Sequence, residues 1–211
     1  MNERLADLGR RFARVATRAV VARPALWRLF RRPMRRQFDA LAPVWEDRFG
    51  PDGLLPLGAA LERIDVPPSR VLDVGTGTGK AARVAARLFS DADVVGVDLS
   101  EEMIRQAERA LPADLAGRVS FQVADASALP FGDAAFDLVV LMNAIPFFEE
   151  LGRVTAAGGT VVFAFTSGPS TPIYVPPETL RRRLEPLGFR AFDDVAAGPG
   201  TAFIARRSPS G

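Results

Sequence analysis

The chain has 211 residues, of which 48% are hydrophobic and 25% charged, so it has enough apolar side chains for one globular domain. It contains no cysteine and no histidine. These absences exclude disulfides, thiolate metal sites, histidine-ligated zinc and Ser-His-Asp hydrolysis, and no metal site is expected. Any general base must be a carboxylate, a tyrosine, the single lysine Lys80 or water.

The net charge of +2 conceals two regions of opposite charge. Residues 1–36 hold 11 arginines against Glu3 and Asp7, a net charge of +9, so the other 175 residues carry −7. No apolar stretch approaches the roughly 20 residues of a membrane-spanning helix, and the run 19–22 is too short for a signal peptide. We therefore expect a cytoplasmic protein with a basic N-terminal appendage, which could place it at the periphery of a membrane.

The first 64 residues predict helices. Apolar residues recur at steps of three and four from Leu5 to Ala19, with arginines on the opposite side, and Pro24 ends this amphipathic basic helix. A second basic helix covers about 26–38, a turn follows at 50–53, and a third helix covers about 54–64.

From residue 71 onward, short β-rich runs alternate with helical segments. Strands are predicted at 71–74, 94–98, 119–124, 136–142, 160–165, 189–195 and 202–205, and helices at 80–89, 101–110, 148–155 and 177–187. This alternation predicts an α/β fold with a doubly wound, mostly parallel seven-stranded sheet, and the last two strands form an antiparallel hairpin at one edge. We expect an N-terminal helical cap or lid at 1–53, a cofactor-binding domain at 54–207 and a tail at 208–211.

The segment 71–79 is a strand that runs into a glycine-rich turn and then into a helix, a geometry that suits a polar or anionic ligand. It is not a P-loop, because Val74 replaces the first glycine and Ala81 replaces the metal-binding hydroxyl. The dinucleotide fingerprint also fails, because Lys80 stands where its third glycine belongs.

The pattern Asp73-x-Gly75-x-Gly77-x-Gly79 instead resembles the first signature of class I S-adenosylmethionine (SAM)-dependent methyltransferases. Three further segments follow in order, at 97–100, 124–131 and 136–139, so the resemblance spans about residues 70–165. The stretch 38–46 looks like the one that precedes the core in ubiquinone/menaquinone-type methyltransferases, with Trp45 in the place of a tyrosine. The resemblance implies a Rossmann-like fold, SAM as cofactor and S-adenosylhomocysteine (SAH) as product.

The resemblance also implies which residues bind the cofactor. The expected set is Asp73, Gly75, Thr76, Gly77, Gly79, Asp98, Leu99, Met103, Asp125, Ala126, Asn143 and Trp45. By resemblance, Asp98 accepts hydrogen bonds from the ribose hydroxyls, Asp125 accepts from the adenine amino group, and Asp73 orders the glycine loop. Helix capping by Asp98, a turn role for Asp125 and core packing of Trp45 are the structural alternatives.

No catalytic residue can be named from the sequence. Glu149, Glu150 and Tyr174 are the candidate bases near the expected pocket, and residues 145–148 are expected to line its apolar part. The resemblance implies in-line displacement onto a small-molecule or lipid-like acceptor, which needs positioning more than a base. The acceptor pocket is completed either by the N-terminal helices or by a second subunit in a homodimer.

An alternative function of a different class remains open: a non-catalytic protein that binds an anionic membrane or a partner through its basic helices. Those helices could also bind nucleic acid or form a lid over the cofactor. Nucleic-acid methylation is disfavoured, because residues 143–147 depart from the compact N/D-P-P-aromatic motif and cysteine is absent.

Overall fold

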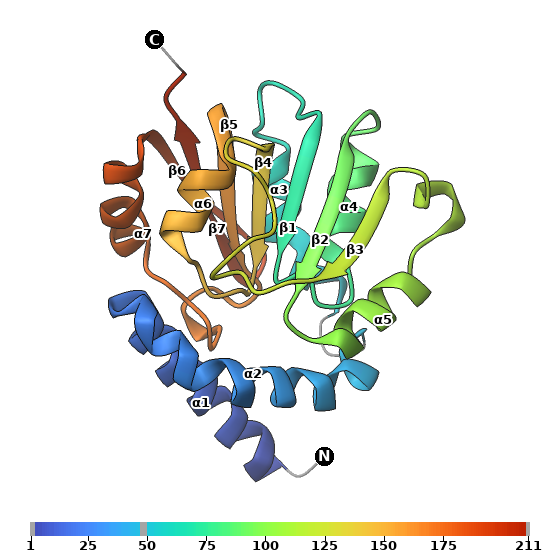
Figure 1. Cartoon of the computed structure of the whole chain (residues 1–211), viewed down its shortest axis with the longest axis vertical. Helices are drawn as coiled ribbons and strands as arrows, with labels where there is room; N and C mark the ends of the chain where they lie inside the picture. The colour runs from blue at the N-terminus through green and yellow to red at the C-terminus, as the bar shows by residue number, and fades with distance from the viewer. Residues whose placement is uncertain (1–2, 47–49, 210–211) are drawn as a thin grey trace.

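The computed structural model describes residues 3–46 and 50–209, without the side chains of residues 3–6 and 51. Seven strands form one sheet in the order β3-β2-β1-β4-β5-β7-β6 (Figure 1). The strands are β1 (Arg70–Val74), β2 (Asp93–Asp98), β3 (Val119–Val123), β4 (Phe136–Met142), β5 (Thr155–Phe165), β6 (Phe189–Ala197) and β7 (Gly200–Arg207). β1 to β5 pair in parallel, and β7 runs antiparallel to both β5 and β6. The predicted fold class is confirmed.

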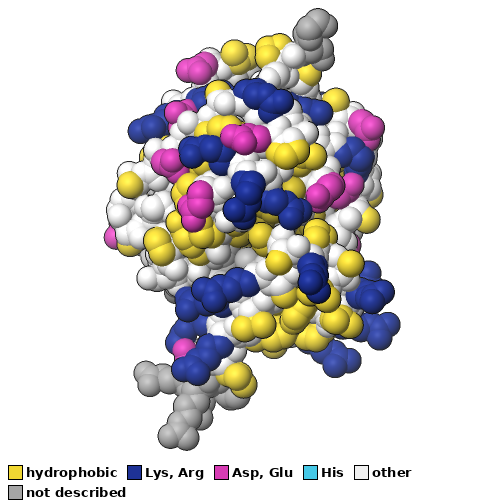
Figure 2. Space-filling model, turned by 90° about the vertical axis from the view of Figure 1, so that its left-hand side faces the viewer, with side chains coloured by type: hydrophobic (Ala, Val, Ile, Leu, Met, Phe, Trp, Pro, Cys, Tyr) yellow, Lys and Arg dark blue, Asp and Glu magenta, His cyan; other side chains and the backbone are white. Residues whose placement is uncertain are grey.

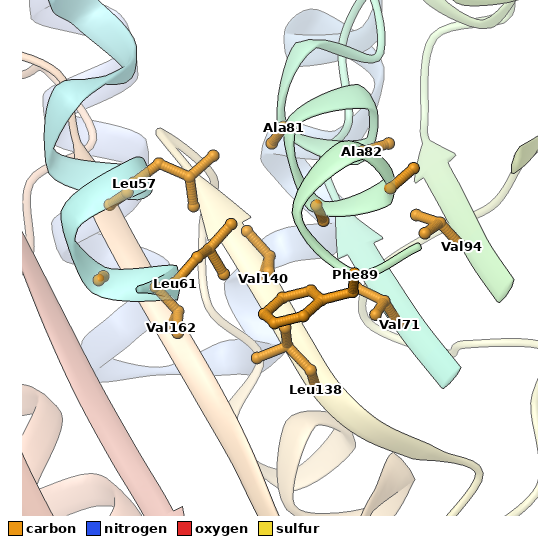
Figure 3. Close-up of a cluster of buried hydrophobic side chains, with 14 of the residues drawn as sticks. Leu57, Leu61, Val71, Ala81, Ala82, Phe89, Val94, Leu138, Val140 and Val162 are labelled. Atoms are coloured by element: carbon orange, nitrogen blue, oxygen red, sulfur yellow. The ribbon is translucent and has the colours of Figure 1, made fainter. Parts of the chain in front are cut away.

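Helices cover both faces of the sheet, which explains why β4 and β5 are almost entirely apolar. They are α1 (Glu3–Ala22), α2 (Trp27–Leu41), α3 (Leu55–Leu61), α4 (Lys80–Leu88), α5 (Glu101–Arg109), α6 (Phe148–Val154) and α7 (Pro177–Leu184). On one face, Leu57 and Leu61 of α3 and the alanines of α4 pack against Leu138 and Val140 (Figure 3). On the other face, α6 and α7 contribute Phe148 and Leu180 to a second core.

Several predicted boundaries differ from the structure, among them those of β5 and of the last helix. β5 begins at Thr155 rather than at 160, and the preceding helix ends at Val154. Gly158 has a φ of +74°, an irregularity that hides the early part of this strand from a pattern search. The last helix ends at Leu184, and a 3₁₀ turn over Glu185–Leu187 replaces its predicted final turn.

The two N-terminal helices lie across the carboxyl-terminal edge of the parallel strands (Figure 1). Ala16 and Val20 of α1 and Trp27 of α2 form a third apolar cluster with Ile145 and Phe147, which follow β4. This cluster fixes both helices above the ends of the central strands. None of the described helices combines the length and hydropathy that a bilayer crossing requires. The division into segments 1–53, 54–207 and 208–211 stays a prediction.

Candidate functional site

A cavity of about 950 Å³, counted with the open space at its mouth, lies between the N-terminal helices and the ends of β1, β2 and β4. Ten of the twelve predicted cofactor residues line it: Trp45, Asp73, Gly75, Thr76, Gly77, Asp98, Leu99, Met103, Ala126 and Asn143. Gly79 and Asp125 do not line it.

The glycine loop needs its glycines for conformation and for close contacts. Gly75, Gly77 and Gly79 have φ values of +70°, +55° and +81°, which L side chains rarely adopt. A Cβ atom on Gly75 would lie 2.6 Å from the Cβ atom of Ala144, so the loop after β4 packs directly on the glycine loop. A Cβ atom on Gly79 would meet the ring of Phe121 at 2.6 Å, so this glycine serves packing against β3.

The Asp73 side chain holds the glycine loop in place through hydrogen bonds. Its Oδ2 atom accepts hydrogen bonds from the Thr76 hydroxyl at 2.6 Å and from the Ala82 N–H at 3.0 Å. Its Oδ1 atom is buried and has no hydrogen-bond partner among the described residues, although Asp73 lines the cavity. Burial raises the pKa of Asp73 to about 7. A buried acceptor without a donor is costly, so Oδ1 is suited to a water molecule or a donor group of a ligand.

Asp98 ends β2 and its carboxylate also faces the loop. Its two oxygens accept hydrogen bonds from the N–H groups of Gly77 and Ser100, each at 2.9 Å. Burial raises the pKa of Asp98 to about 6. The side chain that caps α5 is that of Ser100, whose hydroxyl accepts from Met103 N–H at 3.1 Å. Asp98 is therefore not needed as a helix cap and keeps acceptor capacity for a ligand.

The far wall of the cavity is aromatic. Trp45 makes an edge-to-face contact with Phe38, with ring centroids 5.5 Å apart, and its indole lies against the backbone of Gly77. The adjacent Glu46 forms ion pairs with Lys80 at 3.4 Å and Arg83 at 3.2 Å. These pairs tie the chain after α2 to the first turn of α4 and hold Trp45 at the loop.

Asn143 has a φ of +54°, and its side chain bonds to Thr166 after β5. This left-handed residue turns the chain at the end of β4 so that Ala144 faces Gly75. Of the four residues expected to line an apolar pocket, Ile145 and Phe147 do so, whereas Pro146 and Phe148 are buried outside it.

None of the three candidate bases lines this cavity. Glu149 pairs with Arg183 at 3.2 Å, and Glu150 binds Arg153 and the Leu129 N–H. Tyr174 packs on Phe165 and lines a separate cavity of about 450 Å³, where burial raises the pKa of its hydroxyl. The titratable residues that line the main cavity are Asp73, Asp98 and Lys80.

Sequence reasoning missed several wall residues. Trp27 and Met34 of α2 and Ile173 after β5 line the cavity, so α2 forms part of its wall. Trp27 and Met34 lie on the apolar side of a basic amphipathic helix, and that side was the available signal. The spacing of apolar residues in α2 indicated a buried helix face, but it could not show that this face would line the cavity.

Comparison with known proteins identifies the family of the chain. Residues 71–159 match the family described as "Methyltransferase domain". A malonyl-[acyl-carrier protein] O-methyltransferase of Halorhodospira halophila is 40% identical over 67% of this chain and 50% of its own length. A ubiquinone/menaquinone biosynthesis C-methyltransferase of Geotalea daltonii is 33% identical over 64% of each chain. The chain belongs to the class I SAM-dependent methyltransferases.

The matched part of this methyltransferase spans about half to two thirds of the length of these curated relatives. Among solved structures, the [4+2]-cyclase SpnF has a TM-score of 0.67 and 21% identity, covering 84% of this chain and 96% of that one. At this identity the likeness shows the fold alone.

SAM is the cofactor of this family, and the residues present fit it. The glycine loop allows a ligand to approach the backbone, and Asp98 offers acceptor oxygens. Asp73 Oδ1 is a buried acceptor without a partner in the described part of the chain. Apolar side chains of Leu99 and Met103 lie beside these polar groups.

Proposed function

We propose that this methyltransferase transfers the methyl group of SAM to a small-molecule or lipid-like acceptor. The observation that carries the proposal is the single cavity that combines the glycine loop, Asp98 and a wall of apolar side chains from α2 and the loop after β4. The names of two relatives, malonyl-[acyl-carrier protein] O-methyltransferase and ubiquinone/menaquinone biosynthesis C-methyltransferase, support such an acceptor.

Bound SAM supplies an activated methyl group that a nucleophile can displace in line. In our proposal, Asp98 holds the ribose hydroxyls, Leu99 and Met103 enclose the adenine, and the Ala126 N–H faces a ring nitrogen. Asn143 and Trp45 border the methyl-transfer position, where the indole face attracts a sulfonium. Trp27, Met34 and Phe38 exclude water from the reacting atoms.

Among the described residues, each titratable side chain that lines the cavity is already bound to another part of the protein. Lys80 donates to the Glu46 carbonyl and pairs with the Glu46 carboxylate, while Asp73 and Asp98 bond to the glycine loop. We therefore infer that the acceptor ionises readily or is already nucleophilic, as a phenolate, a carboxylate or an acidic carbon is.

Calorimetry with SAH tests the cofactor site, and a panel of quinol, phenol, carboxylate and lipid acceptors tests the transfer. The wild type should bind SAH with a micromolar Kd, and Asp98→Ala should weaken binding at least about tenfold by removing a charge-assisted acceptor. Asp114→Ala, an exposed aspartate, is the matched control. Equal SAH affinity in the wild type and Asp98→Ala would refute the site.

The outward face of the N-terminal helices supports a second candidate function, attachment to an anionic membrane surface. Leu8 and Val15 of α1 and Leu29 of α2 are 60 to 64% exposed. In Figure 2, apolar side chains gather over the lower, helical part of the molecule with basic side chains around them. An apolar strip bordered by arginines is the pattern of a helix that lies in a lipid headgroup layer.

The arginines of this face are available to lipid phosphates. Six have no carboxylate partner among the described residues, namely Arg14, Arg18, Arg23, Arg28, Arg32 and Arg36. A nucleic-acid surface would not need the exposed leucines and valine, so the combination favours a lipid bilayer.

Flotation with vesicles of phosphatidylglycerol and phosphatidylcholine tests the attachment. The full chain should float with anionic vesicles, and the double variant Val15→Asp, Leu29→Asp should remain in the dense fraction. Val66→Asp, at a residue 78% exposed elsewhere, is the control. Equal flotation of all three proteins would remove the proposal, whereas flotation without SAH binding would favour the non-catalytic function.

A further inference from the structure

Asp125 lies at the rim of the cavity, and its carboxylate is bound by a side chain of α2. Its neighbours Ala124 and Ala126 line the cavity, but its carboxylate accepts a hydrogen bond from the indole N–H of Trp27 at 2.8 Å. These two residues are 98 positions apart in the sequence. Trp27 is only 9% exposed, and its ring packs edge-on against Phe147 with centroids 5.3 Å apart.

The donors are distributed unequally between the two carboxylate oxygens of Asp125. Oδ1 accepts from Trp27, from the Ser127 N–H at 2.9 Å and from the Ser127 hydroxyl at 2.7 Å, which uses its acceptor capacity. Oδ2 has one long contact, 3.4 Å, to Arg31, whose side chain is half exposed. Burial raises the pKa of Asp125, but the bonds from Ser127, Trp27 and Arg31 outweigh it and hold the pKa below its usual range.

We propose that Trp27 is a positioning residue that makes the enzyme specific for the amino group of the cofactor's adenine. Trp27 and Ser127 fix Oδ1, so that Oδ2 is left as the oriented acceptor for an amino group at the rim of the cavity. The weak, exposed Arg31 contact is the one that such a group would displace. This inference rests on the cofactor site described in the proposed function.

The arrangement also links the cap to the cofactor. The hydrogen bond from Trp27 to Asp125 exists only while α2 lies on the loop after β3. The orientation of the Asp125 carboxylate therefore depends on α2 being packed in this position. By thermodynamic reciprocity, a cofactor that donates a hydrogen bond to Asp125 must in turn stabilise the packed position of α2.

The test compares two ligands by calorimetry: SAH, and S-inosylhomocysteine, which carries a carbonyl oxygen in place of the adenine amino group. The wild type should prefer SAH by at least about tenfold, because a carboxylate accepts from an amino group and repels a carbonyl oxygen. Trp27→Phe keeps an aromatic ring against Phe147 but removes the donor. It should lose about three- to tenfold of this preference.

Arg31→Gln should keep or increase the preference, and Arg109→Gln, an exposed arginine of α5, is its control. In Asp125→Asn the preference should be small, and adding Trp27→Phe should then change it no further. A wild-type preference that Trp27→Phe leaves intact would overturn the inference. No SAH binding by the wild type would instead overturn the proposed cofactor site, so the two failures are distinguishable.

Discussion

The buried Asp73 and the partly buried Asp98 of the candidate cofactor site should make the ligand-free protein less stable as the pH rises. The pKa is raised to about 6 for Asp98 and to about 7 for Asp73, whereas an unfolded aspartate titrates near 4. Between these values the folded state binds more protons than the unfolded state. The stability from these groups is therefore complete below pH 4 and is lost as the pH rises through 6 and 7.

The change Asp98→Asn removes one of these titrations. A shift of about two units corresponds to an effect on the order of 3 kcal/mol, of which about 2 kcal/mol falls between pH 4.5 and 8. The lowered pKa values of Asp125 and Glu150 act in the opposite direction at lower pH, and they do so equally in both proteins.

Urea unfolding followed by circular dichroism at pH 4.5, 6 and 8 measures this effect. The unfolding free energy of the wild type should fall by about 2 kcal/mol more than that of Asp98→Asn across this range. Asp114→Asn controls for the substitution itself. Parallel pH profiles for the wild type and Asp98→Asn would refute the burial argument for this carboxyl group.

Three further predictions concern other parts of the site. Gly75→Ala should cost about 2–4 kcal/mol of unfolding free energy, because Gly75 has a positive φ and the new Cβ atom would lie 2.6 Å from that of Ala144. The control Gly117→Ala, where a Cβ atom meets open space, should cost little. Equal urea midpoints for the two variants would contradict this prediction. Arg153→Gln should lower the unfolding free energy by about 2–3 kcal/mol in the same assay, since the guanidinium binds two backbone carbonyls and Glu150. A decrease under about 0.5 kcal/mol would contradict a stabilising role for these bonds. Tyr174→Phe should leave kcat within about twofold, since the hydroxyl lies outside the main cavity, and a tenfold decrease would make it a base.

The sheet could be predicted from the sequence because its strands carry strong local signals. The apolar run of β4 gave its bounds to the residue, and the glycine loop marked the end of β1. The early part of β5 could not be predicted, since the glycines and alanines of 156–159 have low strand propensity. Only pairing with β4, which joins Phe136 to Thr155, defines that part of the strand.

The site was predictable where it follows the ends of strands, and not where it depends on packing between distant segments. Asp73 is the last residue but one of β1 and Asp98 is the last residue of β2, and parallel strands bring their ends together. The bond between Trp27 and Asp125 arises from how α2 packs on the loop after β3, which no local pattern encodes. For the same reason, the sequence suggested Tyr174 as a base, although its ring packs on Phe165 and lines a separate cavity.

A crystal structure of the protein with SAH tests the central claim most directly. We expect the ribose hydroxyls on the Asp98 carboxylate, the adenine between Leu99 and Met103, and the homocysteine chain along the loop from Gly75 to Gly77. SAH bound elsewhere, or with its ribose away from Asp98, would contradict the account.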